Sequence, residues 1–522
     1  MSDSLFWADT IAGKVIKQWN VSTYRTEMGI GASGIPHVGS TGDAVRSYVV
    51  ALGIEDQEKK SELIAFSDDR DGLRKVPAGF PPGLRREIGK PVSMIPDPFG
   101  CHKSFALHVS SLLEGAFKQL GVKYELKRSH QEYKEGTFDE VIVEILNQAK
   151  KAGQVIKRTT GSEKYLKQLP FMPICQSCGR VYTTRAHTWN PDTKKVGYDC
   201  DLSFEGKAGL RPILIKGCGN RGEAGIREGK LAWKVEFAAR WKALDIHYEA
   251  FGKDILDSVR CNDAICREIL GREPPVHSFY ELFTERGGSK LSKSKGNVFN
   301  PQRWMRLGSP EILRLLFLKR LGTARVVDEE SIPPLLDEVD ELDQFYFDPK
   351  GDNERQAAHK KRLFEYMHFL KIPKEAGLQI AHRTLVNIVA SLPIKNKAKV
   401  ILEIVQDSLG DITFEQSKEL KRRIDAAILW TKREKIEQEP VILTKVEKKA
   451  LTNLYDYLEE PHSADDIQTM VFIIAKERAM KPTEMFRLVY KVLIGMDKGP
   501  RAGKLIMLLG RSQVRKLIWD RL

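Results

Sequence analysis

In the first part of this chain, segments with the pattern of strands alternate with segments whose apolar residues recur at helical spacing. Residues 23–28 look like a short strand, the apolar run at 62–67 predicts another, and an apolar helical pattern lies between them at 44–50. Strand-like sequence returns at 244–252, and a helical pattern follows at 259–270. Such alternation of strands and helices is typical of an α/β fold.

The pattern changes at about residue 308, where apolar residues recur at helical spacing. Leu420, Ile424 and Ile428 fall at i, i+4 and i+8, and Thr413 and Gln416 are placed as a capping box ahead of them. We therefore expect an all-α region behind the α/β body.

Three further segments are predicted from local sequence. Residues 485–494 predict a helix that ends at Gly495. Residues 138–152 predict another helix, whereas the Pro- and Gly-rich residues 77–98 predict an irregular segment.

Composition indicates an ordinary globular protein with two to four structural units in 522 residues. No apolar run approaches the ~20 residues that span a bilayer, and the first residues lack the pattern of a signal peptide. Seven cysteines, an odd number with two close pairs, suit a reducing compartment. We expect a cytoplasmic protein with no membrane partner.

The net charge of +14 points to a polyanionic partner, because a basic surface attracts nucleic acid through counterion release. A general lysine bias of the source proteome would produce the same charge. The charge therefore agrees with an RNA partner without identifying one.

Two polar loops have the composition of phosphate-binding segments. Residues 29–40 are glycine-rich and stand between a predicted strand and a predicted helix, so that backbone N–H groups can face an anion. Residues 287–297 contain three lysines, three serines and three glycines. Either loop alone is also compatible with a structural turn or a solvated charge run. The pair is much more specific.

The two loops together resemble the two signature motifs of class I aminoacyl-tRNA synthetases, known by their consensus letters as HIGH and KMSKS. The first motif runs from Ala32 to Ser40, and the second from Lys290 to Ser294. Other segments are similar to one family, the class I type of lysyl-tRNA synthetase: residues 66–77, 97–100, 233–241, 252–254 and 499–501. The resemblance extends from about residue 20 to the C-terminus.

This resemblance implies a Rossmann-type catalytic domain in two halves, with an inserted subdomain between them and a helical anticodon-binding domain behind them. The implied divisions are 1–97 for the first half, 98–230 for the acceptor-end and zinc insertion, 231–307 for the second half, 308–335 for a stem-contact linker and 336–522 for the anticodon-binding domain.

The resemblance also implies the reaction, which is ATP-dependent ligation of L-lysine to tRNA(Lys) through a lysyl-adenylate, with Mg²⁺ and with release of AMP and diphosphate. Such catalysis works mainly through positioning and charge stabilisation. The implied catalytic residues are His37, Lys290 and Lys293. The implied ATP-binding residues are Ser33, Gly34, His37, Gly39, Ser40, Gly252, Asp254 and Lys293. From spacing alone, Asp254 could equally cap the next helix.

A lysine substrate requires an acceptor for its ammonium group, and a carboxylate supplies one. The residues implied for lysine binding are Gly29, Asp69, Trp233 and Glu236. From the residues alone, Trp233 could equally belong to the hydrophobic core. Asp68, Asp69 and Asp71 crowd one loop, and they could simply pair with Arg74 and Lys75. The chain departs from the family pattern at Ser40, where many class I enzymes have His. It also has Gly31 where some relatives have Thr, and Ile255 where some have His.

Two groups of residues have the composition of zinc sites. The first is a set of four cysteines, with reduced thiols of a decayed site as the alternative: Cys175, Cys178, Cys200 and Cys218. The second is a mixed set at a spacing found in some family members: Asp97, Cys101, His102 and His108. Without the resemblance, His108 would be interpreted as a helix-face residue.

Two other functions stay compatible with the residues, namely a class I synthetase for glutamate and a catalytically inactive relative that only binds tRNA. The acidic loops argue against an acidic substrate, and the presence of His37, Lys290 and Lys293 argues against inactivity. The expected partners are tRNA(Lys), L-lysine and ATP, without DNA.

Overall fold

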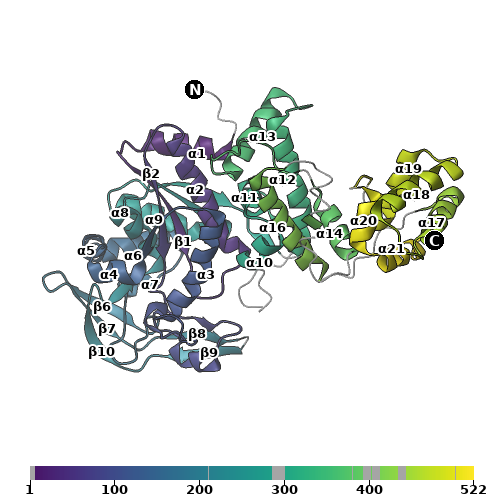
Figure 1. Ribbon diagram of the computed structural model, residues 1–522. Helices are drawn as coiled ribbons and strands as arrows, with labels where there is room; N and C mark the ends of the chain where they lie inside the picture. The colour runs from purple at the N-terminus through teal and green to yellow at the C-terminus, as the bar shows by residue number, and fades with distance from the viewer. Residues whose placement is uncertain are drawn as a thin grey trace. The chain divides into compact units, whose positions relative to one another are not determined.

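The computed structural model describes residues 6–209, 211–284, 300–378, 380–391, 401–402, 412–432, 442–495, 497–499 and 501–522 (Figure 1). The chain divides into two compact units. The first consists of Met1–Trp304, Leu313–Glu329 and Gly351–Ile372, and the second of Met305–Ile312, Glu330–Lys350 and Pro373–Leu522. This division leaves Gly351–Ile372 with the α/β part, whereas the sequence predicted a helical domain from residue 336 onward.

A five-stranded sheet, parallel at every neighbouring pair, organises the first unit in the order β13–β12–β1–β2–β4. Its strands are β1 (Tyr24–Ile30), β2 (Ser61–Ser67), β4 (Glu125–Arg128), β12 (Tyr248–Gly252) and β13 (Val276–Tyr280). Strand order runs outward in both directions from β1. The β1–β12 border is therefore the switch point at which open α/β sheets bind ligands.

Helices cover both faces of this sheet. Successive side chains of a strand point to opposite sides, so neighbouring residues of one strand pack against different helices. Tyr248 and Ala250 of β12 pack with α1 (Trp7–Gln18) and α2 (Gly42–Glu55). Phe251 lies in the other core cluster, whose helices are α5 (Asp139–Asn147), α6 (Ala149–Thr160), α8 (Trp233–Ala243) and α9 (Leu256–Glu268). Because both faces are covered, most residues of β1, β2 and β12 are buried, polar ones included. The α/β fold predicted from the sequence is confirmed.

Helix α3 (Phe105–Leu120) leads into β4, so the central sheet continues beyond residue 97. Most of the small strands lie between β4 and β12: β5 (Phe171–Pro173), β6 (Arg185–Asn190), β7 (Lys195–Asp199), β8 (Ser203–Ala208), β9 (Arg211–Lys216), β10 (Arg221–Gly225) and β11 (Gly229–Leu231). They form antiparallel pairs, and β8 also pairs with β3 (Lys75–Val76). The remaining elements of this unit are α4 (Ser129–Glu135), α7 (Lys164–Lys167), β14 (Phe283–Thr284), β15 (Arg325–Val326) and α13 (Glu354–Met367).

The second unit is helical throughout its described elements. Its helices are α12 (Ile332–Phe347), α14 (His382–Ser391), α16 (Phe414–Thr431), α17 (Lys445–Tyr457), α18 (Ala464–Glu477), α19 (Pro482–Ile494), α20 (Ala502–Leu509) and α21 (Arg511–Trp519). Helices α10 (Pro301–Leu307) and α11 (Pro310–Leu318) each contribute residues to both units. The predicted capping box of Thr413 and Gln416 begins α16, and Gly495 ends α19 with φ 69°. Both predictions are confirmed.

Two of the predicted elements need correction. The helix predicted at 138–152 is two helices, because the chain turns at Gln148, whose side chain donates to the carbonyl of Ile269. The strand predicted from 244 begins only at Tyr248, since α8 extends to Ala243 and Asp245 has φ 53°. None of the helices in the described ranges combines the length and the apolar character needed to cross a membrane.

Candidate active site and metal clusters

The glycine-rich loop after β1 holds His37 at the start of a short helical turn. The residues Val38–Thr41 form a 3-10 turn that continues into α2. The backbone N–H of His37 donates to Oγ of Ser40 at 3.3 Å, and that Oγ lies 3.5 Å from His37 Nδ1. A Cβ on Gly39 would lie 3.0 Å from two atoms of the His37 ring. The imidazole can take this place because residue 39 is glycine.

A pocket of about 230 Å³ opens beside this loop at the ends of β1, β12 and β13. Its lining residues are Gly29, Gly31, His37, Gly39, Ser40, Asp43, Leu113, Asp254, Tyr280, Leu282 and Phe283. Segments more than 200 residues apart in sequence therefore meet at the switch point of the sheet. Of the residues predicted for ATP, His37, Gly39, Ser40 and Asp254 line the pocket.

Asp254 does not cap the helix that follows it. Ile255 is the residue before α9, and no side chain caps that end. A Cβ on Gly252 would lie 2.7 Å from Asp254 Oδ1, so the glycine lets this carboxylate fold back towards β12. Ser33 and Gly34 belong to the same loop as His37 but do not line the pocket. Lys290, Lys293 and Ser294 lie outside the described residues.

Asp43 and Tyr280 are pocket residues that the sequence did not reveal. The hydroxyl of Tyr280 donates to Asp43 Oδ1, and the guanidinium of Arg46 lies 3.8 Å from the centre of the Tyr280 ring. Burial raises the pKa of Asp43 to about 6, against the lowering effects of Tyr280 and Arg46. The position of Asp43, in the first turn of the helix behind a glycine-rich loop, is the one sequence signal that could have indicated it.

Gly29 is the only one of the four predicted lysine-binding residues in the lining of this pocket. Asp69 is buried and accepts the backbone N–H of His130 at 2.7 Å, and burial raises the pKa of Asp69 to about 6. The Trp233 ring packs 4.5 Å from that of Phe237. Asp69 therefore holds the backbone at His130, and Trp233 packs against the core at Phe237.

Glu236 already holds an ammonium group, that of Lys230. The two charged atoms are 2.6 Å apart, and Lys230 also bonds to Asp71. Lys230 and Glu236 are 2% and 4% exposed, and burial raises the pKa of Glu236 while Lys230 opposes the shift. The predicted role of Glu236 with a substrate ammonium therefore requires Lys230 to move away. Asp71 pairs with Lys230 rather than with Arg74 or Lys75.

A second buried network centres on Arg240 of α8. Its guanidinium lies 2.5 Å from Glu27, 3.1 Å from Glu249 and 3.3 Å from Asp68. Glu27 and Glu249 are register partners on β1 and β12, so their carboxylates would repel each other without Arg240. Glu27 stands two residues before Gly29 of the pocket lining, so this cation joins β1 to β12 close to the pocket.

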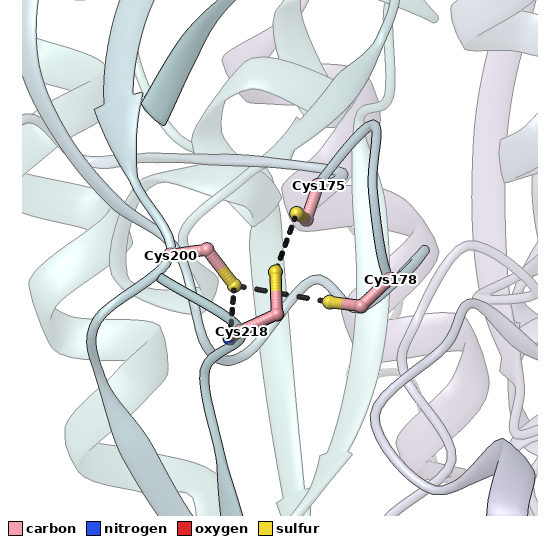
Figure 2. A group of neighbouring side chains, drawn as sticks. All are labelled: Cys175, Cys178, Cys200 and Cys218. Carbon is pink, nitrogen blue, oxygen red and sulfur yellow. Dashed lines mark hydrogen bonds between the residues drawn. The ribbon is translucent and has the colours of Figure 1, made fainter. Parts of the chain in front are cut away.

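The four predicted zinc-binding cysteines meet in space (Figure 2). Cys175 Sγ lies 3.6 Å from Cys218 Sγ, and Cys178 Sγ lies 3.8 Å from Cys200 Sγ. All four sulfurs lie within 4.8 Å of one another. Zn–S bonds of about 2.3 Å in a tetrahedron would separate the sulfurs by about 3.8 Å. The cluster therefore has the dimensions of a tetrahedral thiolate site.

The second predicted set also converges, at the start of α3. Cys101 Sγ lies 3.1 Å from His102 Nδ1, 3.2 Å from His108 Nδ1 and 3.2 Å from Asp97 Oδ2. Backbone N–H groups of Cys101 and His102 donate to the same carboxylate oxygen at 3.0 and 2.8 Å. The ring of His108 thus points into the cluster.

The family model described as tRNA synthetases class I (K) matches residues 5–369, more than half of the chain. The chain belongs to this family. Members similar to it along their whole length include a lysine–tRNA ligase of Cenarchaeum symbiosum (strain A), 40% identical over 99% of this chain and 98% of the relative. A lysine–tRNA ligase of Rickettsia bellii is 30% identical over 95% of this chain and 93% of its own length. One of Archaeoglobus fulgidus is 28% identical over 98% and 99%.

Proposed function

We propose that this class I synthetase is a lysine–tRNA ligase, which activates L-lysine with ATP and transfers it to tRNA(Lys). The observation on which the proposal rests most is the pocket at the switch point, where His37 and Gly39 of the first motif meet Asp254 behind β12. The likeness to lysine–tRNA ligases over nearly the whole chain supports the choice of amino acid.

In the first step, a carboxylate oxygen of lysine attacks the α-phosphorus of ATP, and the bond from that phosphorus to the β-phosphate oxygen breaks. His37 and the bare backbone at Gly39 would hold the α- and β-phosphates, together with Ser33, Gly34 and Ser40. Gly252 and Asp254 would bind adenosine, with the carboxylate on the ribose hydroxyls. Lys290 and Lys293 would neutralise the departing diphosphate. Mg²⁺ would lower the phosphate charge further, and Asp43 and Asp254 offer oxygen donors of the kind it prefers.

In the second step, a ribose hydroxyl at the end of tRNA attacks the activated carbonyl carbon and AMP leaves with its bonding electrons. We assign the binding of the amino acid to Gly29, Asp69, Trp233 and Glu236. Glu236 would release Lys230 and pair with the ammonium group of the substrate instead. The divisions 308–335 and 336–522, most of whose residues belong to the helical second unit, would bind the stem and anticodon of tRNA. A reducing, cytoplasmic location agrees with cysteines that form no disulfide in the described chain.

Both metal clusters fit zinc in donor type and spacing, and the proposed roles are structural. In the first, an ion would cross-link the loop after β5 to both ends of the β8–β9 hairpin through Cys175, Cys178, Cys200 and Cys218. In the second, Asp97, Cys101, His102 and His108 would fix the entry into α3, from which Leu113 reaches the pocket.

Amino-acid-dependent exchange between ATP and labelled diphosphate tests the proposed reaction. Lysine, and neither glutamate nor arginine, is expected to support exchange with Mg²⁺ and without tRNA. Exchange with glutamate alone, or only in the presence of tRNA, would favour the glutamate enzyme. No exchange with any amino acid, alongside normal tRNA binding, would favour the inactive relative.

Substitutions at two glycines distinguish an effect on substrate binding in the pocket from an effect on packing in the core. A Cβ on Gly29 meets no atom within 4 Å, so Gly29→Ala should leave the melting temperature unchanged while its methyl group narrows the pocket. We expect the KM for lysine in exchange to rise about 10-fold or more, the effect of a ~1.4 kcal/mol loss of binding.

Gly42→Ala is the matched control, three residues beyond Gly39. Its Cβ would lie 2.6 Å from Arg46 and 3.2 Å from Phe317, so this change should lower stability by about 1–3 kcal/mol, whereas Gly29→Ala should raise the KM for lysine without lowering stability. Unchanged kinetics in Gly29→Ala would remove Gly29 from the substrate site.

A further inference from the structure

A second pocket lies in the helical unit, between α17 with the residues that follow it and α21. It has a volume of about 420 Å³ and is lined by Tyr455, Leu458, Glu459, Arg511, Ser512, Arg515, Lys516 and Trp519. We name it the α17/α21 pocket. Three cationic side chains, two aromatic rings and a single carboxylate therefore surround one cavity of the size that binds small organic groups.

On α21, the pocket residues and the buried residues lie on opposite faces of the helix. Val514, Leu517 and Ile518 are buried. The pocket residues of this helix fall at i, i+1, i+4, i+5 and i+8, which is one stripe along the opposite face: Arg511, Ser512, Arg515, Lys516 and Trp519. A stripe that only needed to be soluble would gain nothing from a large indole.

Trp519 is the observation that sets this stripe apart from an ordinary charged face. Its side chain is 65% exposed, and it is the only exposed one among the eight tryptophans, all of which the structure describes. Its ring centre lies 5.7 Å from that of Tyr455 at an angle of 36°, and the exposed fraction shows that this contact leaves much of the indole accessible. An open indole face beside cations is a surface on which a nucleobase can stack.

The cations around the pocket are held in place from within the second unit. Arg515 lies 4.4 Å from the centre of the Tyr455 ring and 3.6 Å from Glu459. Arg511 donates to the carbonyl of Glu459 at 2.9 Å. Glu459 is the only acid in the lining, so the three cations leave a surplus of positive charge there. This surplus suits the phosphates on either side of a stacked base.

We propose that the α17/α21 pocket binds an unpaired base of tRNA, with Trp519 as the stacking platform and Arg511, Arg515 and Lys516 on the flanking phosphates. This assignment rests on the proposed tRNA ligase function, and adds the place where the helical unit contacts RNA. A base that is paired in a duplex cannot offer both of its faces, so the pocket selects a loop or an unpaired end.

The test compares Trp519→Ala, Trp519→Phe and the control Phe414→Ala, which removes an aromatic side chain that is 81% exposed elsewhere in the same unit. For Trp519→Ala, the KM for tRNA in lysine charging is expected to rise about 10-fold or more, because base stacking on an aromatic ring is worth roughly a factor of 10 or more. Trp519→Phe retains a ring and should stay within about 3-fold of the unchanged protein. Phe414→Ala should match the unchanged protein, as should lysine-dependent diphosphate exchange in all three.

A direct measurement uses short single-stranded RNA and the fluorescence of the full chain. Binding should quench a part of the emission that is missing in Trp519→Phe. Lys516→Ala should reduce the slope of log affinity against log salt by about 1, the loss of one phosphate contact.

Equal KM values for tRNA in Trp519→Ala and the unchanged protein would overturn the assignment, as would an equal loss in Phe414→Ala. A protein with no lysine-dependent exchange would overturn the proposed function instead. Quenching of Trp519 by RNA in such a protein would still support the pocket.

Discussion

Replacing His37 with alanine is expected to slow lysyl-adenylate formation by about 10²–10³-fold, the usual effect of losing one donor to a transition-state charge. The ring stands over the bare backbone of Gly39 in a pocket that Asp254 also lines. Charge on the α-phosphate oxygens grows as the new bond forms, so the loss should appear in kcat more than in the KM for ATP. Lysine-dependent diphosphate exchange measures both constants.

Ser40→Ala is the matched control for this prediction. Ser40 accepts the N–H of His37 and lies beside its Nδ1, so its removal should loosen the imidazole without deleting it. We expect a decrease in kcat of less than about 10-fold, the effect of a net hydrogen bond of ~1 kcal/mol. An exchange rate in His37→Ala equal to that of the unchanged protein would show that the loop is only a turn. Lys293→Ala should resemble His37→Ala if the second motif neutralises diphosphate.

Replacing Cys200 with serine is expected to remove one zinc ion per chain and to unfold the region between β5 and β10. Zinc stabilises small zinc-binding domains by ~10–16 kcal/mol, so the loss of one of four thiolates should cost at least about 3 kcal/mol here. Cys200 is fully buried and lies beside both Cys178 and the N–H of Cys218, which leaves no room for relaxation into water. Elemental analysis and thermal melts measure the two effects.

Cys266→Ala provides the comparison, because this thiol is buried on α9 and belongs to neither cluster. It should keep the full zinc content and lose only about 1 kcal/mol of stability, the value of a small buried group. Protein that contains no zinc when purified, with a melt that a chelator leaves unchanged, would disprove the structural role. A content of two ions that falls to one in Cys200→Ser would support both clusters.

The sequence determined the elements whose signals are local. The glycine-rich turn into α2, the capping box of Thr413 and Gln416, and the end of α19 at Gly495 each depend on residues within one helical turn. Such interactions form wherever the chain has the right neighbours, so a pattern of residues is enough to place them. The motif around His37 belongs to the same category. Even here local reasoning has limits, because the strand expected at 244 is displaced by Asp245, which pairs with Arg25 and Arg272 from other segments.

The tertiary structure decided which partner each buried charged side chain has. The sequence placed Glu236 near Trp233, but only folding brings Lys230 against it. Only folding likewise brings Tyr280 of β13 to Asp43 of α2. The long gap between Cys200 and Cys218 is spanned by the β8–β9 hairpin, whose antiparallel pairing returns the chain to its starting point. The physical reason is the same in each case. A buried charge or thiol takes its partner from whatever the fold places within a few ångströms, and that distance is set by sheet order and loop closure rather than by separation along the chain.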